Sequence, residues 1–297
     1  MTRMAAPEPE SRDSKPRELD IATPFGKLAV LEWGSSAAPP LLALHGWLDN
    51  AASFARLAPL LAAECRVIAL DLPGHGHSEH LPKQACRYHI VDQVDVILSV
   101  ADALGLERFD LLGHSLGAGI ASYVAIAAPR RVSRLILIEG LGALTDDGTQ
   151  TLTRWREAFA PRKRGTHPQR AYPSVEPAIA ARVAAGGLDA DEARPIVERN
   201  LRKTGAGYVW RSDSRLRRLT PLRIEEAQVR RLLAGIAAPT LLLLAEPATS
   251  YLPTAIIEAR AACVRNIHIE RIAGPHHLHI HCAKQVAELA ADFLRRA

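Results

Sequence analysis

The sequence has no long hydrophobic run and few cysteines, and each absence excludes a class of protein. No stretch approaches the roughly 18 consecutive apolar residues of a membrane-spanning helix. The N-terminus lacks the apolar segment of a secretory signal, and the Pro-rich, polar composition of residues 1–17 predicts a disordered tail. The four cysteines form no CxxC pair, which favours buried, reduced thiols. We therefore expect a cytoplasmic protein without stable membrane insertion.

The composition favours one large globular domain with an inserted lobe, because 48% of the 297 residues are hydrophobic and 23% are charged. The charge is uneven along the chain. Between Arg154 and Arg231 there are 18 Lys and Arg residues against 9 Asp and Glu, which leaves 19 against 23 elsewhere. This basic region could attract acidic substrates or be a solvated surface. Its charges are scattered and form no known nucleic-acid-binding module, so we expect no nucleic-acid partner.

Short apolar runs alternate with longer amphipathic segments. The runs are nearly continuous in hydrophobicity, as strands covered on both faces tend to be, and the longer segments have helical spacing. Such alternation predicts a mostly parallel sheet flanked by helices. The expected strands are LLALH (41–45), RVIAL (66–70), FDLLG (109–113), RLILI (134–138), TLLLL (240–244) and HIERIA (268–273), and the expected helices span 54–63, 89–105 and 116–129. An antiparallel hairpin is expected upstream, over residues 19–34.

The alternation stops after Ile138 and resumes at Pro239. The intervening segment is basic and has helical patterning. We interpret residues 143–236 as a helical cap inserted into a core formed by residues 18–142 and 237–297. Because ligands of open α/β sheets bind beyond the carboxyl ends of the strands, such an insertion would lie over the site as a lid.

A nucleophile motif lies between a predicted strand and a predicted helix. GHSLG at 113–117 fits G-x-S-x-G, whose sharp turn holds the serine clear of the sheet. Gly113 and Gly117 relieve crowding on either side of Ser115. The amide of Leu116 begins the following helix, where free N–H groups and the helix dipole favour negative charge.

A tetrahedral intermediate needs a second N–H donor, which we expect from the loop after an earlier strand. In LLALHGWLDN (41–50) we predict that the Trp47 backbone amide is this donor. His45 is more consistent with bracing the loop than with acting as a base. Asp49 and Asn50 either shape this loop through hydrogen-bonded turns or touch the substrate.

Several of these segments resemble the α/β-hydrolase superfamily. The resemblance covers roughly residues 19–297 and includes HG followed by a bulky residue, DLPGHGHS (71–78) and GHSLG. More narrowly, HGWLDNAASF (45–54), GYVWRSDSRL (207–216) and GPHHLH (274–279) resemble the serine hydrolase-like subfamily. This resemblance implies hydrolysis of an ester or related acyl bond without a cofactor.

The family pattern places the base directly after the last strand, about ten residues before the first apolar residue of the final helix. Counting back from Val286 gives His276, with His277 as the second choice. A serine needs such a base because its hydroxyl is a poor nucleophile. His279 and His281 follow closely, which raises the question of a metal site. No further ligand set converges on them in the sequence, so we expect no metal.

The acid that orients the histidine is not where the family usually has it. The usual position is three residues past the small residue that ends the strand at 240–244, and there the sequence has Ala248. Some haloalkane dehalogenase relatives instead place a glutamate at the end of the strand after the nucleophile helix. Glu139 is in that position, 24 residues after Ser115. We prefer Glu139, since a buried carboxylate needs a partner; Glu246 and the absence of any acid are the alternatives.

We therefore predict a serine hydrolase that cleaves a small carboxylic ester through an acyl-enzyme on Ser115. A serine at position 115, rather than an aspartate, argues against alkyl-enzyme chemistry. One alternative is hydrolysis of a carbon–carbon bond or a thioester by the same triad. The other is a non-catalytic ligand-binding protein on a hydrolase fold, and the alanine at 248 is its support.

Overall fold

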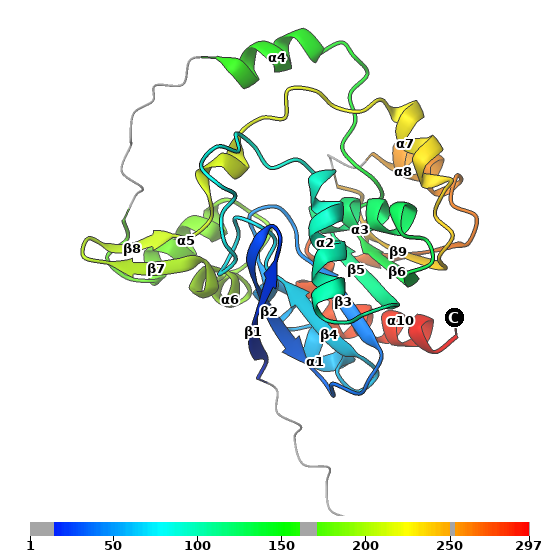
Figure 1. The fold of residues 1–297 in the computed structure, drawn as a ribbon, viewed down its shortest axis with the longest axis horizontal. Helices are drawn as coiled ribbons and strands as arrows, with labels where there is room; N and C mark the ends of the chain where they lie inside the picture. Colours follow the sequence, from blue (N-terminus) through cyan, green and yellow to red (C-terminus); the bar gives the residue numbers. More distant parts are fainter. Residues whose placement is uncertain (1–14, 161–170, 250–252, 297) are drawn as a thin grey trace, which may run out of the picture.

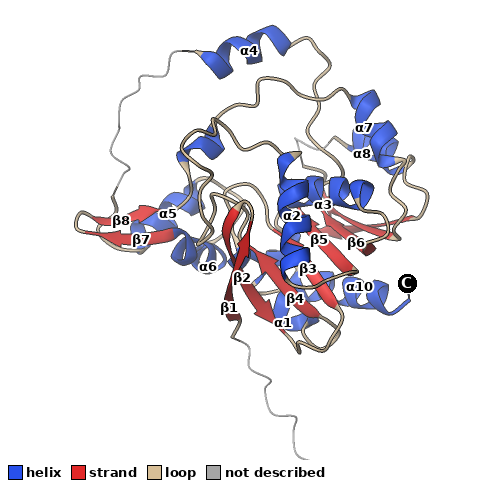
Figure 2. Ribbon diagram, viewed as in Figure 1, coloured by secondary structure: helices blue, strands red, loops and turns tan. Residues whose placement is uncertain are grey.

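The computed structural model describes residues 15–160, 171–249 and 253–296. Their main sheet has eight strands, and helices cover both of its faces (Figures 1 and 2). The strand order is β1-β2-β4-β3-β5-β6-β9-β10. The first two strands form the expected hairpin, and β2 pairs antiparallel with β4, while every further pairing across the sheet is parallel. The strands of this sheet are β1 (Arg17–Thr23), β2 (Gly26–Trp33), β3 (Pro40–Leu44), β4 (Arg66–Leu70), β5 (Phe109–His114), β6 (Val132–Ile138), β9 (Thr240–Glu246) and β10 (Ile267–Ala273).

Both faces of the central strands are buried, which explains their continuous hydrophobicity. In β3, Leu42 and Leu44 belong to one core cluster, whereas Leu41 and Ala43 belong to the cluster on the opposite face. Alternate residues of a strand point to opposite sides, so each face needs its own apolar set. The predicted, mostly parallel sheet flanked by helices is thus confirmed.

Helices close each face. The helices α2, α3 and α8 contribute buried side chains to one cluster, and α1 and α10 contribute to the other. In α10, Val286, Ala290 and Leu294 recur at intervals of four and are buried, as an amphipathic helix requires. The bounds are α1 (Ala58–Leu61), α2 (Asp92–Ala103), α3 (Leu116–Ala127), α8 (Thr254–Ala261), α9 (Leu278–His281) and α10 (Ala283–Arg296), and a 3-10 turn, η1, spans Ala51–Phe54.

The sequence predicts a helical cap over residues 143–236, but the insertion between β6 and β9 is not purely helical. It also contains a two-stranded antiparallel hairpin, β7 (Leu201–Thr204) with β8 (Gly207–Trp210), which lies beside α5 and α6 in Figure 1. Its helices are α4 (Thr151–Phe159), α5 (Glu176–Ala184), α6 (Ala190–Asn200), the 3-10 turn η2 (Ser214–Arg217) and α7 (Glu226–Leu233). The predicted end of the cap at residue 236 also does not match the packing, because Val229 and Leu233 of α7 are buried in the main core.

Two further expectations concern the N-terminal tail and the membrane. The predicted disordered tail, residues 1–17, lies outside the described residues up to position 14, and Arg17 already begins β1. In the described part of the chain, no helix is long and apolar enough to cross a membrane.

Candidate active site

Ser115 lies on a sharp turn between β5 and α3. Its backbone has φ 53° and ψ −112°, and its amide donates to the carbonyl of Ile138 at 2.9 Å. The flanking glycines are required by close approach. A Cβ on Gly117 would lie 2.0 Å from the Leu44 carbonyl oxygen, and one on Gly113 would lie 2.3 Å from the Gly117 oxygen. The serine is partly exposed at the start of α3, where the Leu116 amide lacks a preceding turn to bond to.

Backbone strain is concentrated at the carboxyl ends of three neighbouring strands. Within the described residues, the non-glycine residues with positive φ are Leu48 (63°), Ser115 (53°) and Glu139 (54°). They follow β3, β5 and β6, which are adjacent in the sheet. Such conformations cost free energy and are found mainly where function requires them. The strain therefore marks one edge of the sheet as the candidate site.

Glu139 and His276 meet at this edge. Oε2 of Glu139 lies 3.1 Å from Nδ1 of His276, and 3.1 Å from the Thr249 hydroxyl, which donates to it. Oε1 accepts a 2.6 Å hydrogen bond from the amide of Ala245, at the end of β9. The carboxylate is therefore buried with several donors, as a buried charge requires. Ala248 and Glu246, in contrast, have exposed side chains.

Burial shifts the pKa of both partners. It raises the pKa of the Glu139 carboxyl, although the hydrogen bonds from Ala245 and Thr249 oppose the shift. Burial, followed by the neighbouring His277, lowers the pKa of His276 to about 4. The imidazole is therefore neutral at neutral pH, which is the form that can accept a proton.

The loop after β3 contains the residues expected to hold the oxyanion. A turn from Gly46 to Asp49 is closed by the Asp49 amide and the Gly46 carbonyl at 3.2 Å. His75 supports this turn by accepting a hydrogen bond from the Leu48 amide at 3.3 Å. The exposed indole of Trp47 donates to the Leu216 carbonyl of the insertion at 3.1 Å. These contacts hold the turn on both sides, while the oxyanion role of the Trp47 amide stays a prediction.

Two polar residues of this loop, His45 and Asn50, hold it against neighbouring segments. His45 is fully buried; its Nε2 accepts from the Leu72 amide at 3.0 Å, which is a bracing contact. Asn50 caps η1 through the Ala52 amide and donates to the Ile196 carbonyl of α6 at 2.8 Å. Both side chains thus tie the loop to its neighbours.

Asp49 lies between the second histidine and the insertion. Its carboxylate is 3.4 Å from Nε2 of His277 and 3.2 Å from the guanidinium of Arg182 in α5. Burial by itself would raise the pKa of Asp49, but the hydrogen bond and charge of His277, together with Arg182, hold it below the usual value. His277 therefore faces Asp49, whereas His276 faces Glu139.

Several histidines form a packed cluster beside the turn of Ser115. The ring of His114, which precedes Ser115, lies 4.6 Å from that of His276 and 4.1 Å from that of His279. Nε2 of His114 donates to the His276 carbonyl at 3.1 Å, fixing the loop of the candidate base against the turn of the nucleophile. Among the described residues, no group of three His, Cys, Asp or Glu side chains is arranged to hold a metal ion.

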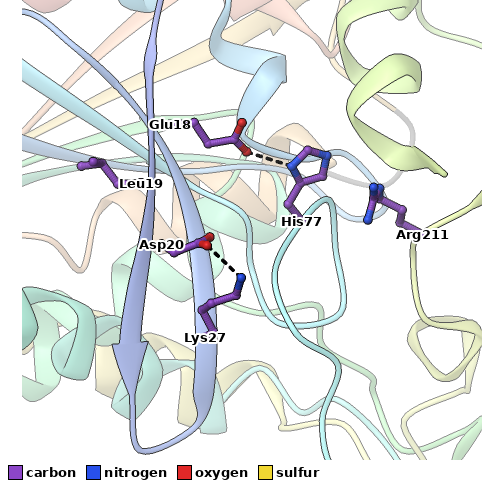
Figure 3. A pocket seen from close by; sticks show the side chains of 6 residues that line it. All are labelled: Glu18, Leu19, Asp20, Lys27, His77 and Arg211. Atoms are coloured by element: carbon purple, nitrogen blue, oxygen red, sulfur yellow. Dashed lines mark hydrogen bonds and ion pairs between the residues drawn. The ribbon is translucent and has the colours of Figure 1, made fainter.

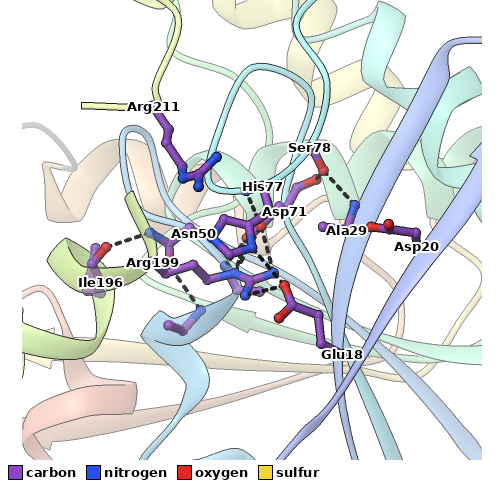
Figure 4. A network of polar contacts seen from close by, with 12 residues as sticks. Glu18, Asp20, Ala29, Asn50, Asp71, His77, Ser78, Ile196, Arg199 and Arg211 are labelled. Atoms are coloured by element: carbon purple, nitrogen blue, oxygen red, sulfur yellow. Dashed lines mark hydrogen bonds and ion pairs between the residues drawn. The ribbon is translucent and has the colours of Figure 1, made fainter. Parts of the chain in front are cut away.

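A buried ion pair joins the insertion to the core near the site. Asp71, after β4, accepts hydrogen bonds from the Ala51 and His77 amides and pairs with Arg199 of α6 at 2.9 Å (Figure 4). Arg199 also contacts Glu18 of β1 at 2.8 Å. A surface pocket beside this pair is lined by charged residues of both signs, and within it Glu18 contacts His77 while Asp20 pairs with Lys27 (Figure 3).

The sequence did not identify several residues that build this site. His114 and His75 lie within GHSLG and DLPGHGHS, so histidines inside recognised motifs were the available signal. Thr249 and Arg182 carried none, because their partners are 110 and 133 residues away in the chain.

Comparison with known proteins identifies the family of this chain. A family model described as the alpha/beta hydrolase fold matches residues 39–210. The chain belongs to the α/β-hydrolase superfamily. Within it, the chain is similar to serine hydrolase-like proteins: 29% identical to one from Danio rerio, covering 94% of this chain and 88% of the relative, and 32% identical to one from Dictyostelium discoideum, covering 90% and 78%. It therefore belongs to the serine hydrolase-like subfamily.

A solved structure also matches this α/β-hydrolase over nearly its full length. A hypothetical protein from Pseudomonas aeruginosa PAO1 superimposes with a TM-score of 0.85 at 36% identity, covering 94% of this chain and 99% of the other. The likeness extends over the insertion as well as the core, and supports the hydrolase fold without naming a substrate.

Proposed function

We propose that this α/β-hydrolase cleaves a carboxylic ester through an acyl-enzyme on Ser115. The observation that supports it most directly is the buried Glu139–His276 pair, at the same sheet edge as a serine with positive φ. A carboxylate that contacts Nδ1 fixes the tautomer in which Nε2 carries no proton and can accept one. Glu139 is thus proposed as the acid in place of a residue at position 248.

The reaction follows from these roles. His276 takes the proton of Ser115 as its oxygen attacks the ester carbonyl, and the amides of Leu116 and Trp47 bind the resulting oxyanion. His276 then gives the proton to the leaving alcohol, and Glu139 stabilises the imidazolium in between. A water molecule deprotonated by His276 attacks the acyl-enzyme and releases the acid.

Labelling with a fluorophosphonate tests this proposal. We expect the wild type to be labelled and to hydrolyse p-nitrophenyl acetate, and Ser115→Ala to do neither. Ser214→Ala is the matched control, since Ser214 is an exposed serine on η2, outside the G-x-S-x-G motif. Labelling that persists in Ser115→Ala would refute the assignment of the nucleophile.

The same experiment separates the alternatives. A labelled serine without ester turnover would favour a thioester or carbon–carbon bond hydrolase with the same triad. The absence of both labelling and turnover in the wild type would favour a ligand-binding protein on this fold.

A further inference from the structure

A small apolar pocket lies beside the residue that follows Ser115. It is lined by Leu116 and Ile120 of α3, by His75, and by Leu216 of the insertion. His75 is the residue that supports Leu48 in the oxyanion loop, and Leu116 supplies the other proposed oxyanion amide. The pocket is therefore next to one expected oxyanion donor, Leu116, and through His75 it adjoins the turn that contains the other, Trp47. Given the proposed function, a group attached to the attacked carbonyl carbon could extend into it.

The volume of the pocket limits what can enter. It measures about 40 Å³, and one water-sized group needs roughly 10–15 Å³ on this scale. The pocket thus holds about three or four non-hydrogen atoms beyond the carbonyl carbon. An acyl group of this size has about four carbons, whereas an octanoyl chain would exceed the space.

The lining includes one amide side chain with a buried, unpaired atom. Gln93, near the start of α2, lines the pocket and is 7% exposed. Its Oε1 has no hydrogen-bond partner among the described residues. Leaving a buried acceptor unpaired costs about 1–3 kcal/mol. A ligand hydroxyl would relieve this cost, and because a hydroxyl both donates and accepts, it suits either orientation of the Gln93 amide.

The insertion closes the pocket through one residue. Leu216 belongs to η2, and its carbonyl accepts the hydrogen bond from the Trp47 indole. The backbone of the closing residue is therefore tied to the oxyanion loop. Shortening its side chain should lengthen the pocket without removing that hydrogen bond.

We propose that this pocket binds the acyl group, and that it selects short hydroxyacyl esters, with Gln93 binding the hydroxyl and Leu216 limiting the chain length. This inference rests on the proposed ester hydrolysis at Ser115. It adds a substrate class and two specificity residues that do not take part in proton transfer.

Steady-state hydrolysis of ethyl esters tests the proposal. Ethyl 3-hydroxybutyrate and ethyl isovalerate have acyl groups of the same shape, with a hydroxyl in one replaced by a methyl in the other. The wild type should favour the hydroxy ester in kcat/KM by about tenfold or more. Gln93→Met keeps the length of the side chain but removes the polar group, and should reduce the ratio to about twofold or less.

Chain length tests the second residue. Leu216→Ala should raise the ratio of kcat/KM for ethyl octanoate over ethyl butyrate by about tenfold, as expected when a pocket wall is removed. Leu222→Ala is the matched control: Leu222 is 56% exposed, also within the insertion, and its loss should leave the ratio unchanged.

The outcomes distinguish the acyl-pocket proposal from the proposed ester hydrolysis at Ser115. Ester turnover with equal rates for the hydroxy and methyl esters, or a Gln93→Met enzyme that keeps the preference, would overturn the acyl-pocket proposal while leaving the serine mechanism intact. Failure of the wild type to hydrolyse any of the esters would overturn both. The wild-type ratios do not depend on the folding of any variant.

Discussion

Glu139→Gln is the sharpest test of the candidate site. In the wild type, Oε1 accepts from the Ala245 amide at 2.6 Å, and Oε2 faces both Thr249 and Nδ1 of His276 at 3.1 Å. Glutamine has the same shape, and its oxygen can keep the bond from Ala245. Its amide nitrogen would then replace Oε2 beside His276.

This exchange reverses the polarity of the contact with the imidazole. An amide N–H can only donate, so Nδ1 of His276 would have to accept and the ring proton would move to Nε2. A protonated Nε2 cannot take the proton of Ser115. The equivalent acid-to-amide change in a serine protease lowers kcat about 10⁴-fold. We therefore expect a loss of about 10³- to 10⁴-fold in kcat/KM, or roughly 4–5.5 kcal/mol of transition-state stabilisation.

The assay is p-nitrophenyl ester hydrolysis, with Glu246→Gln as the matched control because its side chain is exposed at the end of β9. Thermal unfolding should show that Glu139→Gln remains folded, since it removes a buried charge without changing volume. If Glu139→Gln retains activity within about threefold of wild type, or if Glu246→Gln loses more, the assignment of Glu139 as the acid is wrong.

Three predictions concern stability. Arg199→Ala should lower the free energy of unfolding, measured in urea, by about 3–5 kcal/mol, because it leaves Asp71 buried without its cation. Arg194→Ala, which breaks a partly exposed ion pair, should lower it by only about 0–1 kcal/mol. Equal losses in the two variants would contradict the reasoning. Gly117→Ala should lower the unfolding temperature by many degrees, because its Cβ would lie 2.0 Å from a backbone oxygen, while Gly205→Ala, with open space around it, should not. Burial lowers the pKa of His45 to about 4 and of His75 to about 3, and holds those of His114 and His279 well below 6.5. Below about pH 6.5 the unfolded chain therefore binds more protons than the folded chain does. The free energy of unfolding should consequently decrease as the pH is lowered, by up to about 1.4 kcal/mol per pH unit for each histidine. Urea midpoints that stay constant between about pH 7 and 5.5 would contradict this.

The sheet could be predicted because its signal is local. Strands such as β4 and β9 are buried on both faces, so their apolar runs are short, continuous and bounded by turns. The sharp turn at Ser115 was equally visible, because the two glycines that its close packing requires, Gly113 and Gly117, lie within two residues of Ser115 in the sequence. In both cases the residues that determine the structure are neighbours in the chain.

The insertion was predicted less well because its structure depends on distant partners. β7 and β8 have four residues each and are mostly polar or half-buried, too short to show an alternating pattern. Helix α7 has an evident apolar face, but the sequence does not reveal that Val229 and Leu233 pack against the core instead of within the cap. Amphipathic spacing identifies a helix and its buried face, and says nothing of which surface covers that face.

The position of the candidate acid follows from how adjacent parallel strands end. Strands β6 and β9 are neighbours, and the Glu139 amide bonds to the Leu243 carbonyl at 2.9 Å. Neighbouring strands lie about 4.8 Å apart, a separation that a glutamate side chain can span. A carboxylate that leaves β6 can therefore reach the space beyond β9, where the Ala245 amide and Thr249 bind it. The alanine at 248 is then no evidence against catalysis, because the carboxylate reaches His276 from the neighbouring strand.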